Sequence, residues 1–163
     1  KDYGHMLRLD RDYASKAAAV SAMARDITEF LSEIGLPAIA APRPLRVAHH
    51  SACSMQHGQQ IRTEPRQLLE NAGFEVADIP EGHLCCGSAG TYNILQPEIA
   101  TRLRDRKVAN IASVAPDIIA TGNIGCITQI GQATRTPILH TVQLLDWAYG
   151  GYEPKVLRES AKE

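Results

Sequence analysis

The sequence lacks several features that would each assign it to a familiar class of protein. Aromatic residues make up only 5% of its 163 residues, and its formal net charge is −1. Without a basic surplus, it has no electrostatic basis for binding nucleic acid. No apolar run approaches the ~20 residues that a membrane-spanning helix requires, and the first residues do not resemble a signal peptide. We therefore expect a soluble globular protein.

Signatures of self-sufficient enzymes are missing as well. The chain contains no G-x-G-x-x-G, no G-x-S-x-G and no H-E-x-x-H, so neither a dinucleotide-binding enzyme nor a hydrolase is indicated. Its 4 cysteines are too few for a disulfide scaffold, and the adjacent Cys85 and Cys86 cannot readily bond to each other without distorting the peptide between them. We expect reduced thiols, a cytoplasmic location and no catalytic residues.

Helix and strand patterns alternate along the chain. Apolar residues recur every three to four positions over residues 12–34, which predicts one helix ended by Gly35 and Pro37. Short apolar or β-branched runs predict strands at residues 45–49, 74–79, 117–121 and 137–140. Helices are expected to start or be capped at Thr63, Pro97 and Thr141. This order predicts an α/β fold with a parallel sheet of about four strands and helices on both faces.

We expect a single domain over residues 1–163. Within it, residues 1–44 form an N-terminal helix and a proline-rich connector, residues 45–149 a cysteine-rich core, and residues 150–163 a fraying tail. In the helix that begins at Pro97, apolar residues such as Ile99 should face the core. A basic cluster should face solvent, with docking of a partner as the alternative interpretation: Arg102, Arg104, Arg106 and Lys107.

The cysteines all follow predicted strands. Cys53 comes after the first strand, Cys85 and Cys86 after the second, and Cys126 after the third. Loops that leave the carboxyl ends of parallel strands lie along one edge of the sheet, where ligands bind. Cysteines that are far apart in the sequence should therefore meet in the loops at this edge.

Four converging thiolates suit either a four-iron, four-sulfur (4Fe-4S) cluster or a tetrahedral zinc ion. Structural zinc sites usually pair cysteines about two to four residues apart. No such pair occurs here, so the spacing favours a cluster without excluding zinc. Gly87 and Gly90 allow the loop after the cysteine pair to fold closely around an inorganic group. The alternative is that Cys85 and Cys86 are small buried residues in a glycine-rich turn.

Other polar residues flank the cysteines. Asn123 can cap a short helix that holds Cys126 in its first turn, where backbone N–H groups favour a thiolate. Gln129 lies on the same helix face, so it can hydrogen-bond a cluster sulfur or a substrate, or be an ordinary exposed glutamine. His57 and His83 are close to cysteines in sequence and are candidate ligands or hydrogen-bond donors to ligands. Packing roles are favoured for the remaining histidines at strand ends: His49, His50 and His140.

Three separated blocks of the sequence resemble a known family. They are Cys53, Cys85-Cys86-Gly87 and Gly125-Cys126-Ile127-Thr128-Gln129. This arrangement is similar to the cysteine-rich CCG domain that is found in heterodisulfide reductases. Within that family, the stretches at 83–93, 122–130 and 140–146 most resemble the C-terminal part of glycolate oxidase (glycolate dehydrogenase) iron-sulfur subunits.

The resemblance implies a role in electron transfer. Such a domain would pass electrons from flavin-containing subunits, which oxidise glycolate to glyoxylate, towards a quinone or another acceptor. It further implies that the chain is the C-terminal part of a longer subunit, in the cytoplasm or at the inner face of the membrane through its partners. By residue, it implies a 4Fe-4S cluster on Cys53, Cys85, Cys86 and Cys126, surrounded by His57, His83, Gly87 and Gln129.

One departure from the family pattern affects the cofactor. The heterodisulfide reductase pattern ends in C-x-x-C, whereas Gln129 stands at the last position here. An ordinary cubane, a zinc ion and a metal-free site are therefore all open. The alternative functions are a zinc-binding or metal-free docking module, the electron-transfer subunit of a lactate-utilisation complex, and a redox protein that reacts through Cys85 or Cys86.

Overall fold

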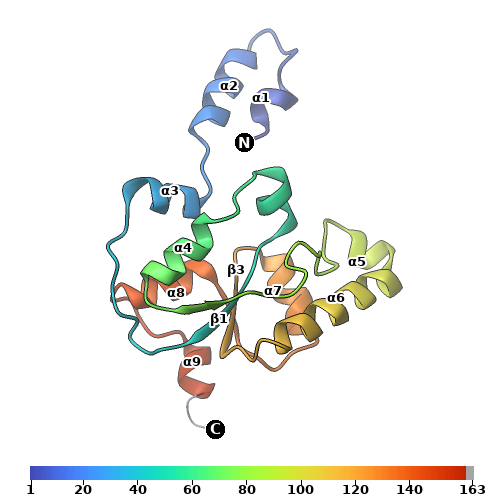
Figure 1. Cartoon of the computed structure of the whole chain (residues 1–163). Coiled ribbons are helices and arrows are strands. Elements are labelled where there is room, and N and C mark those ends of the chain that lie inside the picture. Colours follow the sequence, from blue (N-terminus) through green and yellow to red (C-terminus); the bar gives the residue numbers. More distant parts are fainter. Residues whose placement is uncertain (161–163) are drawn as a thin grey trace. The chain divides into compact units, whose positions relative to one another are not determined.

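The chain separates into two compact units in the computed structural model, which describes residues 1–160. The first unit, Lys1–Gly35, is helical, and the second, Leu36–Glu163, contains the sheet and the cysteines (Figure 1). The helices of the first unit are α1 (Tyr3–Met6), α2 (Ala14–Met23) and α3 (Ile27–Ile34).

The single helix predicted over residues 12–34 is wrong, because the chain leaves helical geometry between α2 and α3. Asp26 has an extended backbone (ψ 149°), and its carboxylate accepts hydrogen bonds from the Thr28 backbone N–H (2.9 Å) and hydroxyl (2.6 Å). The Glu29 carboxylate accepts one from the Asp26 N–H (2.8 Å) in return. This capping box starts a new helix. Its two carboxylates accept hydrogen bonds from backbone N–H groups that would bond to carbonyls of the preceding turn in a continuous helix. Gly35 ends α3 as predicted, with φ 73°.

The second unit is built on a four-stranded parallel sheet with the order β2-β1-β3-β4. The strands are β1 (Arg46–His50), β2 (Glu75–Ala77), β3 (Ile118–Thr121) and β4 (Ile138–His140). Every residue of β3 is buried, as expected of a parallel strand covered on both faces. The register joins Val47 to Ile118 and His50 to Thr121, so the carboxyl ends of β1 and β3 lie side by side. At this pair the strand order changes direction.

Helices cover both faces of the sheet, which confirms the predicted α/β fold (Figure 1). On one face, α4 (Glu64–Asn71) contacts α8 (Thr141–Ala148), and on the other, α6 (Pro97–Ala112) contacts α7 (Ile124–Gly131). The shorter elements are the π-helix η1 (Ser54–Gly58), α5 (Tyr92–Leu95) and α9 (Lys155–Ser160). Among the described residues, no helix has both the length and the apolar character needed to cross a membrane.

Two predictions about α6 are wrong. Lys107, predicted to face solvent, is completely buried, and Ile99, predicted to face the core, is 47% exposed. The lysine leaves solvent because its ammonium group bonds to two backbone carbonyls of the loop after β2. A prediction from helical periodicity assigns charged residues to the solvent face and cannot include a hydrogen-bond partner that lies far away in the sequence.

Predictions about helix ends are corrected in three places. His140, and not Thr141, caps α8: its Nδ1 accepts a hydrogen bond from the Val142 N–H (3.2 Å). Thr63 stands at the N-cap position of α4 but makes no side-chain cap bond. The tail does not fray from residue 150, because α9 buries Leu157 to 1% exposure. Residues 161–163 of the predicted tail lie outside the described residues.

Candidate metal centre

The four cysteines gather at the carboxyl-terminal edge of the sheet. Cys53 follows β1, Cys85 and Cys86 follow β2, and Cys126 lies in the first turn of α7 after β3. All are free thiols, and they line one cavity of about 420 Å³. The cavity lies beyond the ends of β1 and β3, where the strand order reverses and where ligands bind in open parallel sheets.

The loop that carries Cys85 and Cys86 packs directly against the backbone of α6. Gly87 has φ +91°, and a Cβ atom there would lie 2.4 Å from the Ala100 carbonyl oxygen. Glycine is therefore required for this close approach. The Gly87 N–H donates a hydrogen bond to the Cys85 sulfur (3.2 Å), and the Ser88 hydroxyl lies 3.1 Å from the Cys86 sulfur. Gly87 thus acts on the site through its backbone.

A buried lysine holds the beginning of the same loop. The Lys107 ammonium group donates hydrogen bonds to the carbonyl oxygens of Glu81 (2.9 Å) and Gly82 (3.3 Å). The Glu81 carboxylate in turn pairs with Arg106 and accepts a hydrogen bond from Asn110 (2.9 Å), both on α6. Burial lowers the pKa of Lys107, whereas the nearby cysteine thiols act in the opposite direction. A positive charge therefore lies beside the cysteine site, and sequence analysis did not predict it.

The thiols perturb one another. A hydrogen bond from Cys86, opposed by burial, lowers the pKa of Cys126. Hydrogen bonding with Cys86 and then burial raise the pKa of Cys85 to about 12. Burial and then Cys85 raise the pKa of Cys53 to about 11. The pKa values of Cys53, Cys85 and Cys126 thus depend on neighbouring thiols, and a bound cation would displace protons from this site.

The start of α7 positions Cys126. The Asn123 side-chain oxygen accepts a hydrogen bond from the Cys126 backbone N–H (3.2 Å), which confirms the predicted cap. Gln129, one turn further along, is 5% exposed and accepts a hydrogen bond from the Asn93 amide (3.4 Å). The interpretation of Gln129 as an ordinary exposed residue is therefore wrong. Whether it contacts a bound group stays a prediction.

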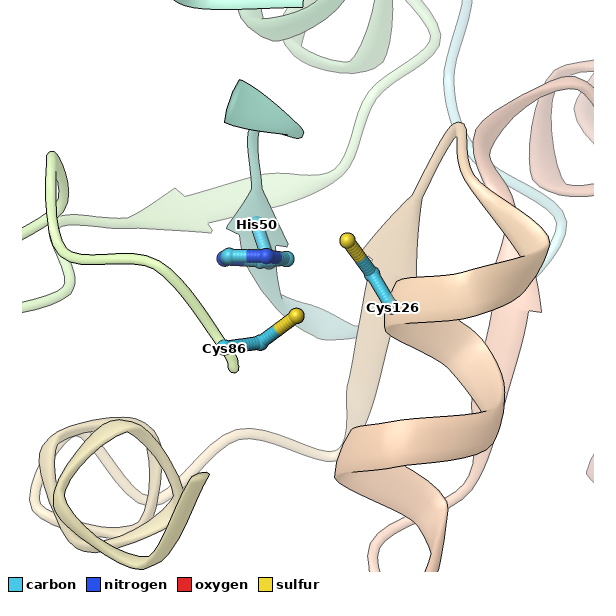
Figure 2. A group of neighbouring side chains, drawn as sticks. All are labelled: His50, Cys86 and Cys126. Atoms are coloured by element: carbon cyan, nitrogen blue, oxygen red, sulfur yellow. The ribbon is translucent and has the colours of Figure 1, made fainter. Parts of the chain in front are cut away.

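The structure places His50 beside the cysteines, although a packing role was favoured for this residue. Strand β1 runs one residue further than predicted, so that His50 ends the strand and is 1% exposed. One of its ring nitrogens and the sulfurs of Cys86 and Cys126 lie within 4.8 Å of one another. Figure 2 shows the three side chains turned towards a common space. Neither ring nitrogen has a hydrogen-bond partner within the described part of the chain.

The other histidines lie elsewhere. His57 and His83, the candidates nearest to cysteines in sequence, are both exposed, and their proposed roles stay predictions. His140 uses both ring nitrogens locally, since its Nε2 lies 3.1 Å from the Gly122 carbonyl oxygen and its Nδ1 caps α8. His49, next to His50, lines a different cavity together with Arg66.

Comparison with known proteins places this cysteine arrangement in context. Residues 47–131 match the family model described as CCG, a cysteine-rich domain. The chain is 41% identical to the glycolate oxidase iron-sulfur subunit of Escherichia coli (strain K12), and 30% identical to the probable glycolate oxidase iron-sulfur subunit of Bacillus subtilis (strain 168). Each match covers 91% of this chain and 36% of the relative, so the chain spans about a third of the length of these proteins. It is also 29% identical to lactate utilization protein A of Geobacillus thermodenitrificans, with 80% of this chain and 56% of the relative covered.

Proposed function

The chain belongs to the family of cysteine-rich CCG domains, and we propose that it holds an iron-sulfur cluster and transfers electrons within a complex that oxidises glycolate. The observation that carries this proposal is the convergence of four free thiols on one cavity. The identity to the glycolate oxidase iron-sulfur subunit of Escherichia coli supports glycolate as the substrate of the complex. A flavin-containing subunit is the proposed partner that carries out the oxidation.

The donor set fits a cluster. Thiolates are the usual protein ligands of iron-sulfur clusters, and Cys53, Cys85, Cys86 and Cys126 would supply them. The Ser88 hydroxyl, 3.1 Å from the Cys86 sulfur, and the Gly87 N–H, 3.2 Å from the Cys85 sulfur, are donors of the kind that tune a cluster. Cys86 and Cys126 are buried and Cys53 and Cys85 are half-buried. We infer that electrons enter or leave on the side of Cys53 and Cys85.

The proposed electron path begins and ends outside this chain. Oxidation of glycolate to glyoxylate releases an electron pair and a pair of protons, which the flavin takes up. When bound, the cluster supplies one-electron transfer, so the electrons leave the flavin singly. A quinone, or another acceptor on the cytoplasmic side, receives the electron pair together with the protons. The residues of this chain would hold the cluster and shield it on the side where Cys86 and Cys126 are buried.

The first test is the iron, zinc and acid-labile sulfide content of the chain purified without air. We expect about four irons and four sulfides per chain and a broad visible absorption that bleaches on reduction. Cys→Ser changes at each of the four cysteines should lower the iron content, and Ser88→Ala should keep it. Stoichiometric zinc without sulfide would indicate instead a structural docking module, and a metal-free folded chain would contradict both.

A lactate-utilisation complex is the second candidate, because lactate utilization protein A is also similar to the chain. The two are separated by mixing the cluster-loaded chain with its flavin-containing partner and adding one 2-hydroxy acid at a time. Glycolate should bleach the cluster faster than lactate. Faster bleaching by lactate would reassign the substrate while leaving the electron-transfer function intact.

A further inference from the structure

His50 is as buried as an apolar core residue, although its side chain carries two polar nitrogens. Its side chain is 1% exposed, and both ring nitrogens lack a hydrogen-bond partner among the residues that the structure describes. Leaving a polar group buried and unpaired is unfavourable. The nitrogens of a buried imidazole therefore normally form a hydrogen bond or bind a metal. The residues around His50 indicate which of the two applies.

Those surroundings offer thiols. A His50 nitrogen and the sulfurs of Cys86 and Cys126 lie within 4.8 Å of one another, and Figure 2 shows both sulfurs close to the ring. A tetrahedral ion with metal–sulfur bonds of about 2.3 Å and metal–nitrogen bonds of about 2.0 Å holds its ligand atoms roughly 3.5–3.8 Å apart. Small side-chain movements would therefore bring the His50 nitrogen within bonding distance of a metal that is held by these sulfurs.

Strand register brings His50 to this point. Side chains alternate between the two faces of a strand, so His50 shares a face with Ala48, which packs in the core cluster with Cys86 and Cys126. His49 lies on the other face, in a cavity lined by Arg66 and Asp78. The strand end is otherwise poorly satisfied, since the hydroxyl of Thr121, the register partner of His50, also lacks a partner in the described chain.

We propose that His50 is a metal ligand of the cysteine site, with one ring nitrogen bound to metal beside Cys86 and Cys126. The inference rests on the proposed function and adds a nitrogen donor to its thiolates. A neutral imidazole leaves the buried side of the centre less negatively charged than another thiolate would. Imidazole in place of thiolate raises the reduction potential of other iron-sulfur centres, so the native centre should have a higher potential than one with a thiolate at position 50.

The test compares His50→Gln with His49→Gln, a matched control one residue away on the opposite face of the strand. The chain is labelled with ¹⁵N-histidine, reconstituted without air with ferrous iron and sulfide, and reduced. Pulsed EPR should detect a coordinated histidine nitrogen in the native chain and in His49→Gln, and not in His50→Gln. His50→Cys offers a thiolate at the same place, so it should bind iron without the nitrogen signal and with a lower midpoint potential.

The outcomes separate this inference from the proposed function. A full complement of iron and sulfide with no coordinated nitrogen in the native chain overturns ligation by His50 and leaves the proposed function standing. If no sulfide-containing cluster forms, the proposed function fails, and Co²⁺ binding decides the role of His50. In that case, a Kd weakened at least about tenfold by His50→Gln and unchanged by His49→Gln supports ligation, and equal values overturn it. A native chain that binds neither metal overturns both.

Discussion

Two side chains at the cysteine site, His50 and Lys107, combine full burial with a polar group, and they differ in how that group is satisfied. Lys107 donates to two backbone carbonyls, whereas the His50 ring has no partner in the described chain. Burying an unpaired polar group is unfavourable, so the two arrangements have different consequences. The lysine has partners in the protein and supports the loop, while the histidine is open to a ligand.

Lys107→Met should lower the free energy of unfolding by about 1–3 kcal/mol, because it keeps the aliphatic stem and removes the charged donor to the Glu81 and Gly82 carbonyls. It should also lower the reduction potential of a bound cluster, because the added electron loses a favourable interaction with a nearby positive charge. Urea unfolding and a redox titration measure the two effects. Arg102→Met, an exposed position on the same helix, is the control and should change neither. An unaltered unfolding free energy in Lys107→Met would mean that water satisfies the carbonyls equally well.

Gly87→Ala tests the close approach of the cysteine loop to α6. A Cβ atom at this position would lie 2.4 Å from the Ala100 carbonyl oxygen, on a backbone with φ +91°. We expect a loss of roughly 1–3 kcal/mol from backbone strain alone, more from the clash, and a lower iron content. Gly90→Ala is the control in the same loop, because φ is also positive (+54°) but no atom lies within 4 Å of the added Cβ. Equal unfolding free energies for the two variants would contradict the role given to the contact.

At the scale of elements, helix starts decide where site residues lie. The Asn123 cap begins α7 so that Cys126 falls in its first turn, at the cavity. The Asp26 capping box starts α3 and divides what periodicity predicts as one helix. In both cases a side-chain oxygen accepts a hydrogen bond from a backbone N–H group at the first turn. A polar residue in the local sequence thus determines where the helix begins.

Asn123→Ala should destabilise the chain by about 1 kcal/mol, because the Cys126 N–H loses its acceptor at the helix start. Asn123→Ser keeps a neutral capping oxygen and should recover most of that stability. Thermal unfolding of the metal-free chain compares the variants without a contribution from bound metal. Equal stability of the alanine and serine variants would show that the cap bond contributes nothing measurable.

At the scale of the whole molecule, the change in strand order at β1 and β3 gathers loops from three strands around one cavity. A metal bound there would link segments that are distant in sequence. Binding to the folded state alone adds to stability by mass action.

Removing iron with a chelator should therefore lower the melting temperature. A site with free metal at about 100 times its Kd would lose about 2.7 kcal/mol of stabilisation. Scanning calorimetry before and after chelation measures the change, and Cys126→Ser should respond much less. Coincident melting curves for the loaded and the chelated native chain would show that the metal does not stabilise the fold.

Sequence patterns are sufficient to predict the α/β order, the parallel sheet and the meeting of the cysteines at one edge. These follow from local signals: strand-length apolar runs, proline and glycine boundaries, and the rule that loops at the carboxyl ends of parallel strands share an edge. The cap at Asn123 was equally local, and the Asp26–Glu29 capping pattern was present in the sequence as well.

The burial and hydrogen bonding of single residues, in contrast, depend on how the elements pack together. Lys107 follows three arginines on α6 and bonds to carbonyls 25 and 26 positions away, and no periodicity encodes that contact. Strand β1 extends one residue beyond its expected end and so includes His50. Because side chains alternate between the two faces of a strand, His50 lies on the opposite face from His49, near Cys86 and Cys126. The chain's local pattern thus determines which elements form, whereas the packing of one element on another determines which polar groups are buried and whether they find a partner.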